Sequence, residues 1–121
     1  MKKSILIDKI DDLDQDYINI KEVISLFEIR YFLDKLKLIV ENIFEVEDIS
    51  NKCKKEQYCV ARSVFAYIAL KEKYKKTQIA QKINKDRTTV HHMVVKFKDY
   101  QKYYPQYKTK INETLNWYDD N

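Results

Sequence analysis

Glycine is absent from this chain of 121 residues, and proline occurs only once, at Pro105. Tight β-hairpin turns depend on glycine, often in Asn-Gly or Asp-Gly pairs, because the backbone there adopts positive φ angles. The lack of these pairs disfavours an all-β fold and favours helices joined by short polar connections. We therefore expect an all-α fold, a helical bundle with a long helix in its N-terminal half.

Long apolar runs are also missing from the sequence. No stretch approaches the roughly 18 residues that a membrane-spanning helix requires. The short apolar segment after Lys3 ends almost at once, which is unlike a secretory signal peptide. We therefore expect a cytoplasmic protein without a membrane partner. In such a reducing compartment, Cys53 and Cys59 are expected to be free thiols.

The sequence shows none of the motifs that we would expect of an enzyme or a cofactor-binding protein. A chain without glycine cannot contain the glycine-rich phosphate loop of an ATPase. The spacing of Cys53 and Cys59 fits a zinc site poorly, and His91 and His92 would point about 100° apart on a helix. A tyrosine nucleophile for DNA strand transfer would need supporting Arg and His residues, and no such arrangement accompanies the tyrosines of this chain. We expect no enzymatic activity, metal or cofactor, and a nuclease or transposase is the least favoured function.

Positive charge is concentrated in the middle of the chain. Residues 1–50 carry seven Lys and Arg against 12 Asp and Glu, whereas residues 51–110 carry 16 against four. Such an excess is typical of a phosphate-binding surface, although a lysine-rich solubilising face has the same composition. We predict an acidic N-terminal extension over residues 1–36, which includes part of the long helix, and a basic domain over residues 37–121.

Apolar spacings of three and four residues predict the helices. The long helix is expected over residues 17–44, with one stripe formed by Leu26, Ile29, Leu33, Leu36, Val40 and Ile43. This stripe predicts packing against the rest of the domain, or alternatively a homodimer or protein-binding surface, although it is too short to indicate a coiled coil. We expect a loose segment or a short helix over residues 1–16.

Shorter helices are expected in the basic region, over residues 60–73, 78–83, 87–100 and 106–117. A basic loop, residues 53–57, precedes the first of them. Thr77 and Asp86 are expected to cap the second and third helices, because their side-chain oxygens can accept unpaired backbone N–H groups. Pro105 fits the first turn of the last helix.

The two helices around Asn84 predict a helix-turn-helix, whose second helix enters the DNA major groove. On that second helix, Val90, Met93, Val94 and Phe97 form one apolar face. The exposed N-terminal turn then presents Arg87, Thr88, Thr89, His91 and His92. Arginine can donate twice to guanine, threonine can contact a base or the thymine methyl, and Asp86 can accept from cytosine. For His91, partial packing against the preceding helix is an open alternative.

Cations around this segment have a different predicted role. Lys75, Lys76, Lys85 and Lys96 are placed for contacts to DNA phosphates, which supply affinity rather than sequence information.

The segment Asp86-Arg87-Thr88-Thr89-Val90-His91-His92 resembles the signature of the DNA-binding C-terminal domain of the bacterial replication initiator DnaA. Upstream, Ala61-Arg62-Ser63-Val64 is similar to that family's Ala-Arg-Gln helix, and Ile79-Ala80 stands where the family has Ile-Gly. The resemblance covers about residues 38–100. It implies a Trp repressor-like helix-turn-helix domain that stands without the family's ATPase.

The resemblance also implies roles for individual residues. Asp86, Arg87, Thr88 and Thr89 would read bases, supported by His92. The basic-loop residues Lys54, Lys55 and Gln57 would approach the minor groove, and Lys76 and Thr77 would lie near the DNA. The chain departs from the family where Arg87 replaces a histidine and Asn84 alone replaces a glycine pair.

We therefore expect sequence-specific binding of double-stranded DNA, in replication initiation or transcription regulation. The alternative is a protein-interaction or dimerisation module that acts through the acidic N-terminal helix.

Overall fold

The structure is a computed structural model that describes residues 17–120, with side chains from residue 31 onward. The chain divides into two compact units, residues 1–34 and 35–121. Helix α2 (Tyr17–Phe44) begins in the first unit and ends in the second. The expectation for residues 1–16, and the expected burial of Leu26 and Ile29, lie outside the described part.

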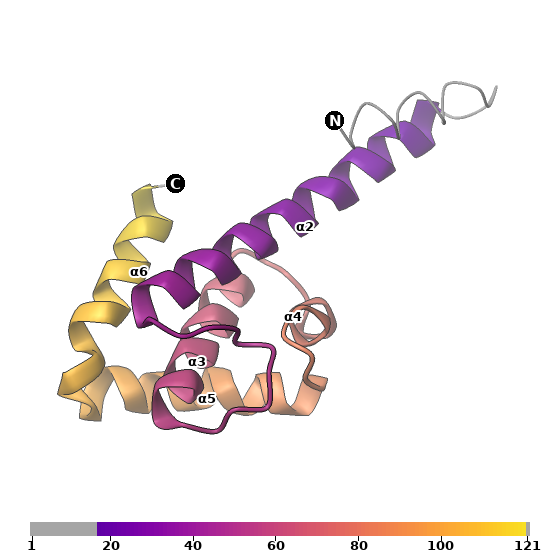
Figure 1. The fold of residues 1–121 in the computed structure, drawn as a ribbon. Coiled ribbons are helices and arrows are strands. Elements are labelled where there is room, and N and C mark those ends of the chain that lie inside the picture. Colours follow the sequence, from indigo (N-terminus) through magenta and orange to yellow (C-terminus); the bar gives the residue numbers. More distant parts are fainter. Residues whose placement is uncertain (1–16, 121) are drawn as a thin grey trace. The chain divides into compact units, whose positions relative to one another are not determined.

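The second unit contains four further α-helices and one short 3-10 helix (Figure 1). They are α3 (Glu56–Lys71), α4 (Lys76–Lys82), α5 (Arg87–Tyr103), η1 (Pro105–Tyr107) and α6 (Lys108–Asp120). No strand occurs between residues 17 and 120. The prediction of an all-α fold is therefore confirmed for the described part of the chain.

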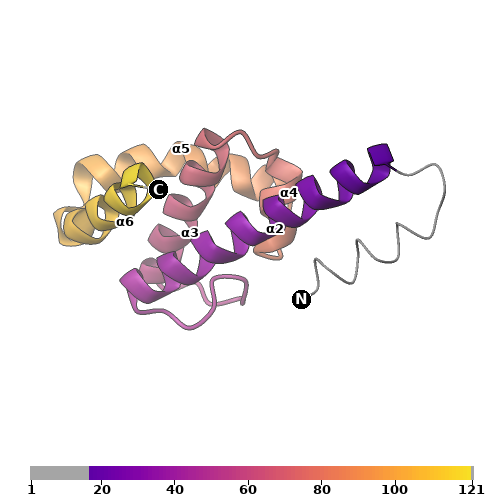
Figure 2. The ribbon, with the colours of Figure 1, turned by 90° about the horizontal axis from the view of Figure 1, so that it is seen from above.

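Helix α3 is the central element of this unit. It packs against α4, α5 and α6, and Figure 2 shows it between α6 and α4. Val60, Val64, Phe65 and Ile68 are fully buried, and each such side chain stabilises the fold by about 1.5–3 kcal/mol. The ring of Tyr67 stacks on Phe97 of α5, with centroids 4.2 Å apart. The apolar sequence of α3 thus builds the core on which α4 and α5 rest.

The C-terminal part of α2 follows its predicted stripe. Leu36 and Val40 are fully buried, as expected, and Phe44 continues the same face one turn later. Ile43 is only half-buried. Phe44 rather than Ile43 therefore completes the buried face of this helix.

Three helices end at residues with positive φ, although the chain has no glycine. These residues are Glu45 (φ 56°), Lys73 (φ 78°) and Asn84 (φ 55°). After each of them, the next backbone N–H donates to a carbonyl in the last helical turn, in the pairs Val46 to Glu41 (3.0 Å), Tyr74 to Ala69 (3.1 Å) and Lys85 to Ala80 (2.9 Å). This is the Schellman motif, in which glycine is usual. A side chain with a Cβ costs about 1 kcal/mol there, least for asparagine.

Several predicted helix boundaries are wrong. The helix expected over residues 60–73 is α3, Glu56–Lys71. It begins earlier because the Lys55 carbonyl accepts the N–H of Cys59 at 3.1 Å, and it ends earlier because the backbone reverses at Lys73. The last helix, expected over residues 106–117, is divided into η1 and α6, and α6 continues to Asp120.

The predicted cap of α4 at Thr77 is also wrong. Lys75 occupies the N-cap position, and Thr77 lies exposed inside the first turn. The side chain of Gln78 is three residues after the cap, so its Oε1 can accept the Lys75 N–H, at 2.8 Å.

Replacing Lys73 with glycine should raise the free energy of unfolding. Lys73 is exposed and lies in the left-handed region, where glycine has no Cβ to strain the backbone. We expect Lys73→Gly to stabilise the protein by about 0.5–1 kcal/mol, measured by urea denaturation. Lys71→Gly, at the last residue of α3, is the control and should destabilise the protein, by less than the ~1 kcal/mol of a helix interior. A loss of stability in both variants would contradict this account of the helix end.

Candidate nucleic-acid interface

Asp86 fixes the start of α5. Its Oδ1 accepts the backbone N–H of Thr89 at 2.7 Å, so the predicted cap is confirmed. The hydrogen bonds from the backbone and side chain of Thr89 lower the pKa of the Asp86 carboxyl. The carboxylate therefore stays ionised and holds the first turn of α5 in place.

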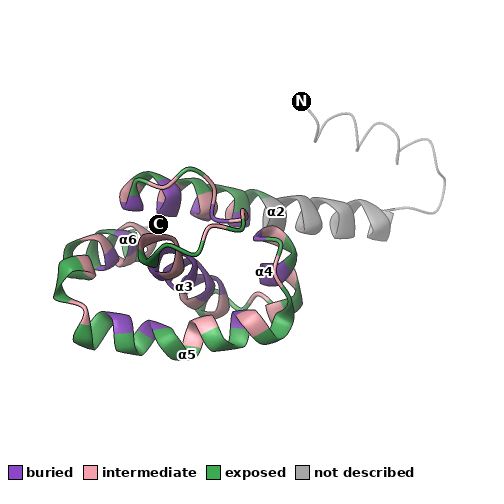
Figure 3. Ribbon diagram, turned by 60° about the horizontal axis from the view of Figure 1, so that its bottom comes forward, coloured by how far each residue is buried: buried purple, intermediate pink, exposed green. Residues whose placement is uncertain are grey.

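The faces of α5 follow the predicted helical spacing. Val90 and Phe97 are buried, and Met93 and Val94 are half-buried. The first turns of the same helix expose four side chains, those of Arg87, Thr88, His91 and His92. Figure 3 shows buried and exposed residues alternating along α5. The apolar face thus anchors α5 on α3 and leaves polar side chains at its N-terminal end facing solvent.

Arg62, on α3, organises the loop of residues 45–55. Its side chain is only 4% exposed. Nε donates to the carbonyl of Ile49 (2.7 Å), Nη1 to that of Cys53 (2.7 Å) and Nη2 to that of Asn51 (2.8 Å). Three carbonyl dipoles thus solvate the buried guanidinium. One side chain therefore sets the path of the loop.

Carboxylates hold the preceding part of the same loop. Glu41 Oε2 accepts the backbone N–H of Ile49 at 2.9 Å. Asp48 Oδ1 accepts from the hydroxyl of Ser50 (2.6 Å) and from its N–H (2.9 Å). The bonds from Ser50, with the ammonium of Lys37, lower the pKa of Asp48 to about 2. Side-chain bonds therefore fix the loop on both sides of Ile49.

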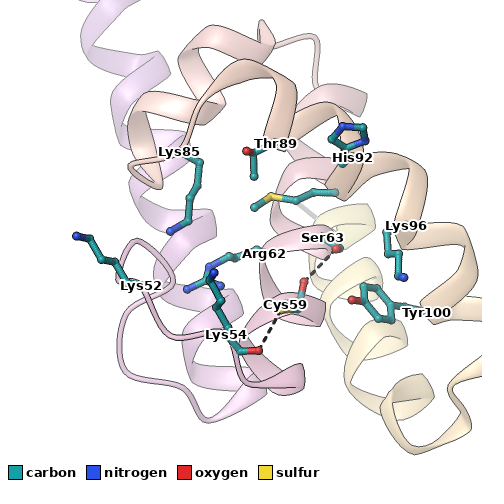
Figure 4. Close-up of a pocket in the computed structure, with 11 residues that line it drawn as sticks. Lys52, Lys54, Cys59, Arg62, Ser63, Lys85, Thr89, His92, Lys96 and Tyr100 are labelled. Atoms are coloured by element: carbon teal, nitrogen blue, oxygen red, sulfur yellow. Dashed lines mark hydrogen bonds between the residues drawn. The ribbon is translucent and has the colours of Figure 1, made fainter.

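A cationic pocket lies between this loop, α3 and α5 (Figure 4). We call it the loop pocket. It has a volume of about 500 Å³. Its lining includes five cationic side chains, those of Lys52, Lys54, Arg62, Lys85 and Lys96, and no carboxylate. Cys59, Met93 and Tyr100 contribute its less polar surface. Thr89 and His92 also line it, so α5 borders the pocket along one side.

Lys85 lies among the other cations of this pocket, and its pKa responds to them. Its Nζ donates to the Asn51 carbonyl at 2.9 Å, the same oxygen that accepts from Arg62. Partial burial lowers the pKa of Lys85, and the charges of Arg62, Lys52 and Lys54 lower it further. An anion bound in the pocket would offset this repulsion.

A second hollow lies on the other side of the α5 N-terminus. This outer groove has a volume of about 360 Å³ and is lined by Lys76, Arg87, Thr88 and His91. Lys76 Nζ lies 3.0 Å from His91 Nδ1, which joins α4 to α5. His91 therefore contacts the preceding helix while its ring remains exposed. The first two turns of α5 thus present side chains to two separate hollows.

The structure brings most of the predicted site residues together in these two hollows. The loop pocket gathers Lys54, Lys85, Thr89, His92 and Lys96. The outer groove gathers Lys76, Arg87, Thr88 and His91. Lys55, Lys75 and Thr77 are exposed and line neither of them, and Asp86 acts as the cap between them.

The predicted placement of Gln57 in the basic loop is wrong. Helix α3 begins at Glu56, so Gln57 lies in its first turn, where its Nε2 donates to the carbonyl of Phe44. Conversely, the sequence prediction omitted Lys52 and Arg62 as pocket residues. Arg62 could have been found, because it is the only charged residue in the apolar stretch from Val60 to Leu70.

Comparison with protein-family models, curated proteins and solved structures found no match to this chain. Among residues 17–120, no helix is long and apolar enough to cross a membrane. The same part of the chain contains no cluster of His, Cys, Asp and Glu side chains that could hold a metal ion.

Arg62→Met should destabilise the protein and loosen the 45–55 loop. Methionine keeps the aliphatic volume but removes the donors to the Ile49, Asn51 and Cys53 carbonyls. We expect the free energy of unfolding to fall by about 2–4 kcal/mol, and amide hydrogen exchange to accelerate in the loop before it does in α3. Lys71→Met, at an exposed position on the same helix, is the matched control. An unchanged exchange rate in the loop would contradict the role given to Arg62.

Proposed function

We propose that the protein binds double-stranded DNA in a sequence-specific manner, in replication initiation or transcription regulation. In this proposal α4 and α5 act as a helix-turn-helix in a Trp repressor-like domain similar to the C-terminal domain of DnaA. Helix α5 enters the major groove and the 45–55 loop contacts the adjacent backbone. The main supporting observation is the loop pocket, with five cations and no carboxylate beside the exposed start of α5.

The charges of the pocket favour a polyanion over a protein partner. The cations come from the 45–55 loop, α3, the turn before α5 and α5 itself, yet they line one cavity. A DNA strand carries regularly spaced phosphates, which such a surface can neutralise with release of counterions. The lowered pKa of Lys85 agrees with this proposal: partial burial lowers it first, and the nearby charges of Arg62, Lys52 and Lys54 lower it further.

The exposed turn of α5 supports base reading beside this backbone site. Recognition helices contact base edges with residues of their N-terminal turns. Here Arg87 and Thr88 are exposed at that end, while Val90 and Phe97 hold the helix against the core. Asp86 keeps the turn ordered through its bond to the Thr89 N–H.

Removing a pocket cation should weaken binding to all duplexes. We expect Lys54→Ala and Lys96→Ala to lower the affinity for every sequence and to reduce the salt slope of binding by about one. Thr88→Ala should instead reduce discrimination between sequences. The measurements are fluorescence anisotropy over a salt series and selection from a random duplex library.

Lys108→Ala is the matched control, because Lys108 is exposed and lines neither hollow. It should leave both the affinity and the salt slope nearly unchanged. If the wild-type protein binds no duplex at low salt, the proposed function is wrong. Equal effects of Lys54→Ala and Lys108→Ala would exclude the loop pocket as the site.

A second candidate function is homodimerisation or partner binding through α2, which spans residues 17–44. The observation that favours it is Leu38, an apolar side chain on this helix that is 66% exposed. This candidate predicts that the protein self-associates and that Leu38→Lys shifts it toward the monomer in sedimentation-velocity experiments. A wild-type protein that stays monomeric at high concentration would contradict the homodimer.

A further inference from the structure

We infer that the outer groove recognises the major-groove edge of guanine, and that Lys76 prepares His91 for this role. The inference rests on the proposed DNA binding and specifies which base one side of α5 reads. It starts from the 3.0 Å contact between Lys76 Nζ and His91 Nδ1. It also depends on the four side chains that line the groove.

The contact determines which nitrogen of His91 carries the proton. A lysine ammonium has three donors and no acceptor, so His91 Nδ1 must accept from Lys76. A neutral imidazole that accepts at Nδ1 carries its hydrogen at Nε2. The His91 ring is exposed, so this Nε2–H is available to a ligand. Lys76 therefore acts as a positioning residue that makes the far side of His91 a hydrogen-bond donor.

The groove then presents donors almost exclusively. Arg87 and His91 are four residues apart on α5 and so lie on the same side of that helix. The Arg87 guanidinium carries five N–H donors in a planar fork, and Lys76 retains the donors that His91 does not use. Because Lys76 occupies the acceptor nitrogen of His91, Thr88 is the only lining residue with a side-chain acceptor left for a ligand, and no carboxylate lines the groove.

Among the bases, guanine fits this set of donors best. Its major-groove edge offers two acceptors, N7 and O6, side by side. Adenine places a donor next to its N7, cytosine presents a donor, and thymine pairs its one acceptor with a methyl group. A phosphate would also accept from these donors. The proposal commits to guanine because the groove lies at the exposed start of α5, where recognition helices read bases.

The test replaces guanines in a selected duplex, one at a time, with 7-deazaguanine, which lacks the N7 acceptor but pairs normally. We expect at least one replacement to weaken wild-type binding about tenfold. In Lys76→Met and His91→Ala, the same replacement should have a much smaller effect, because the donor it opposes is lost or misplaced. Lys73→Met is the matched control, since Lys73 is exposed, lies three residues before Lys76 and does not line the groove, and it should keep the tenfold effect.

A second measurement reads the tautomer directly and needs no DNA. Long-range ¹H–¹⁵N correlation spectra of the free protein should show the His91 proton on Nε2 in the wild type and in Lys73→Met. In Lys76→Met the two tautomers should exchange. A wild-type spectrum with the proton on Nδ1 would overturn the role given to Lys76.

The outcomes separate this inference from the proposed function. If the protein binds duplexes but no guanine replacement matters, DNA binding stands and the guanine assignment is wrong. If Lys76→Met weakens all sequences equally and lowers the salt slope by about one, the groove holds a phosphate instead. If no duplex binds at low salt, the proposed function and this inference are both overturned.

Discussion

The buried guanidinium of Arg62 is the interaction on which the arrangement of the candidate site depends. A buried charge is costly unless surrounding groups solvate it, and here the carbonyls of the 45–55 loop do so. The chain must therefore fold this loop around α3 for Arg62 to be satisfied. Because the loop carries Lys52 and Lys54, the same interaction brings their charges to the side of α5. A requirement of the core thus creates the cationic pocket.

Local features of the candidate site could be predicted from the sequence. The spacing of Val90 and Phe97 determines which side of α5 is buried, whatever the rest of the chain does. Asp86 precedes a helical stretch and can bond only to N–H groups within its reach, so its capping role is a local property. The all-α class can also be predicted from composition, because a chain without glycine has few means of forming tight hairpins.

The remaining features depend on contacts between distant residues. The role of Arg62 requires loop carbonyls up to 13 positions away, and no propensity encodes their direction. The Lys76–His91 contact depends on how α4 crosses α5, which apolar periodicity does not specify. The sequence predicts the start of α3 too late, because Glu56 and Gln57 are polar and resemble loop residues. Helix ends are decided by individual hydrogen bonds, and the Lys55 carbonyl supplied one here.

The shared carbonyl of Asn51 has a consequence for the thermodynamics of association. It accepts from Arg62 and from Lys85, which lie on different elements, and so ties the loop to the turn before α5. A flexible loop would lose conformational entropy on meeting its ligand, and this loss would oppose binding. In this protein, folding has already ordered the loop. If the loop contacts DNA as proposed, its ordering would therefore add little to the entropy cost of association.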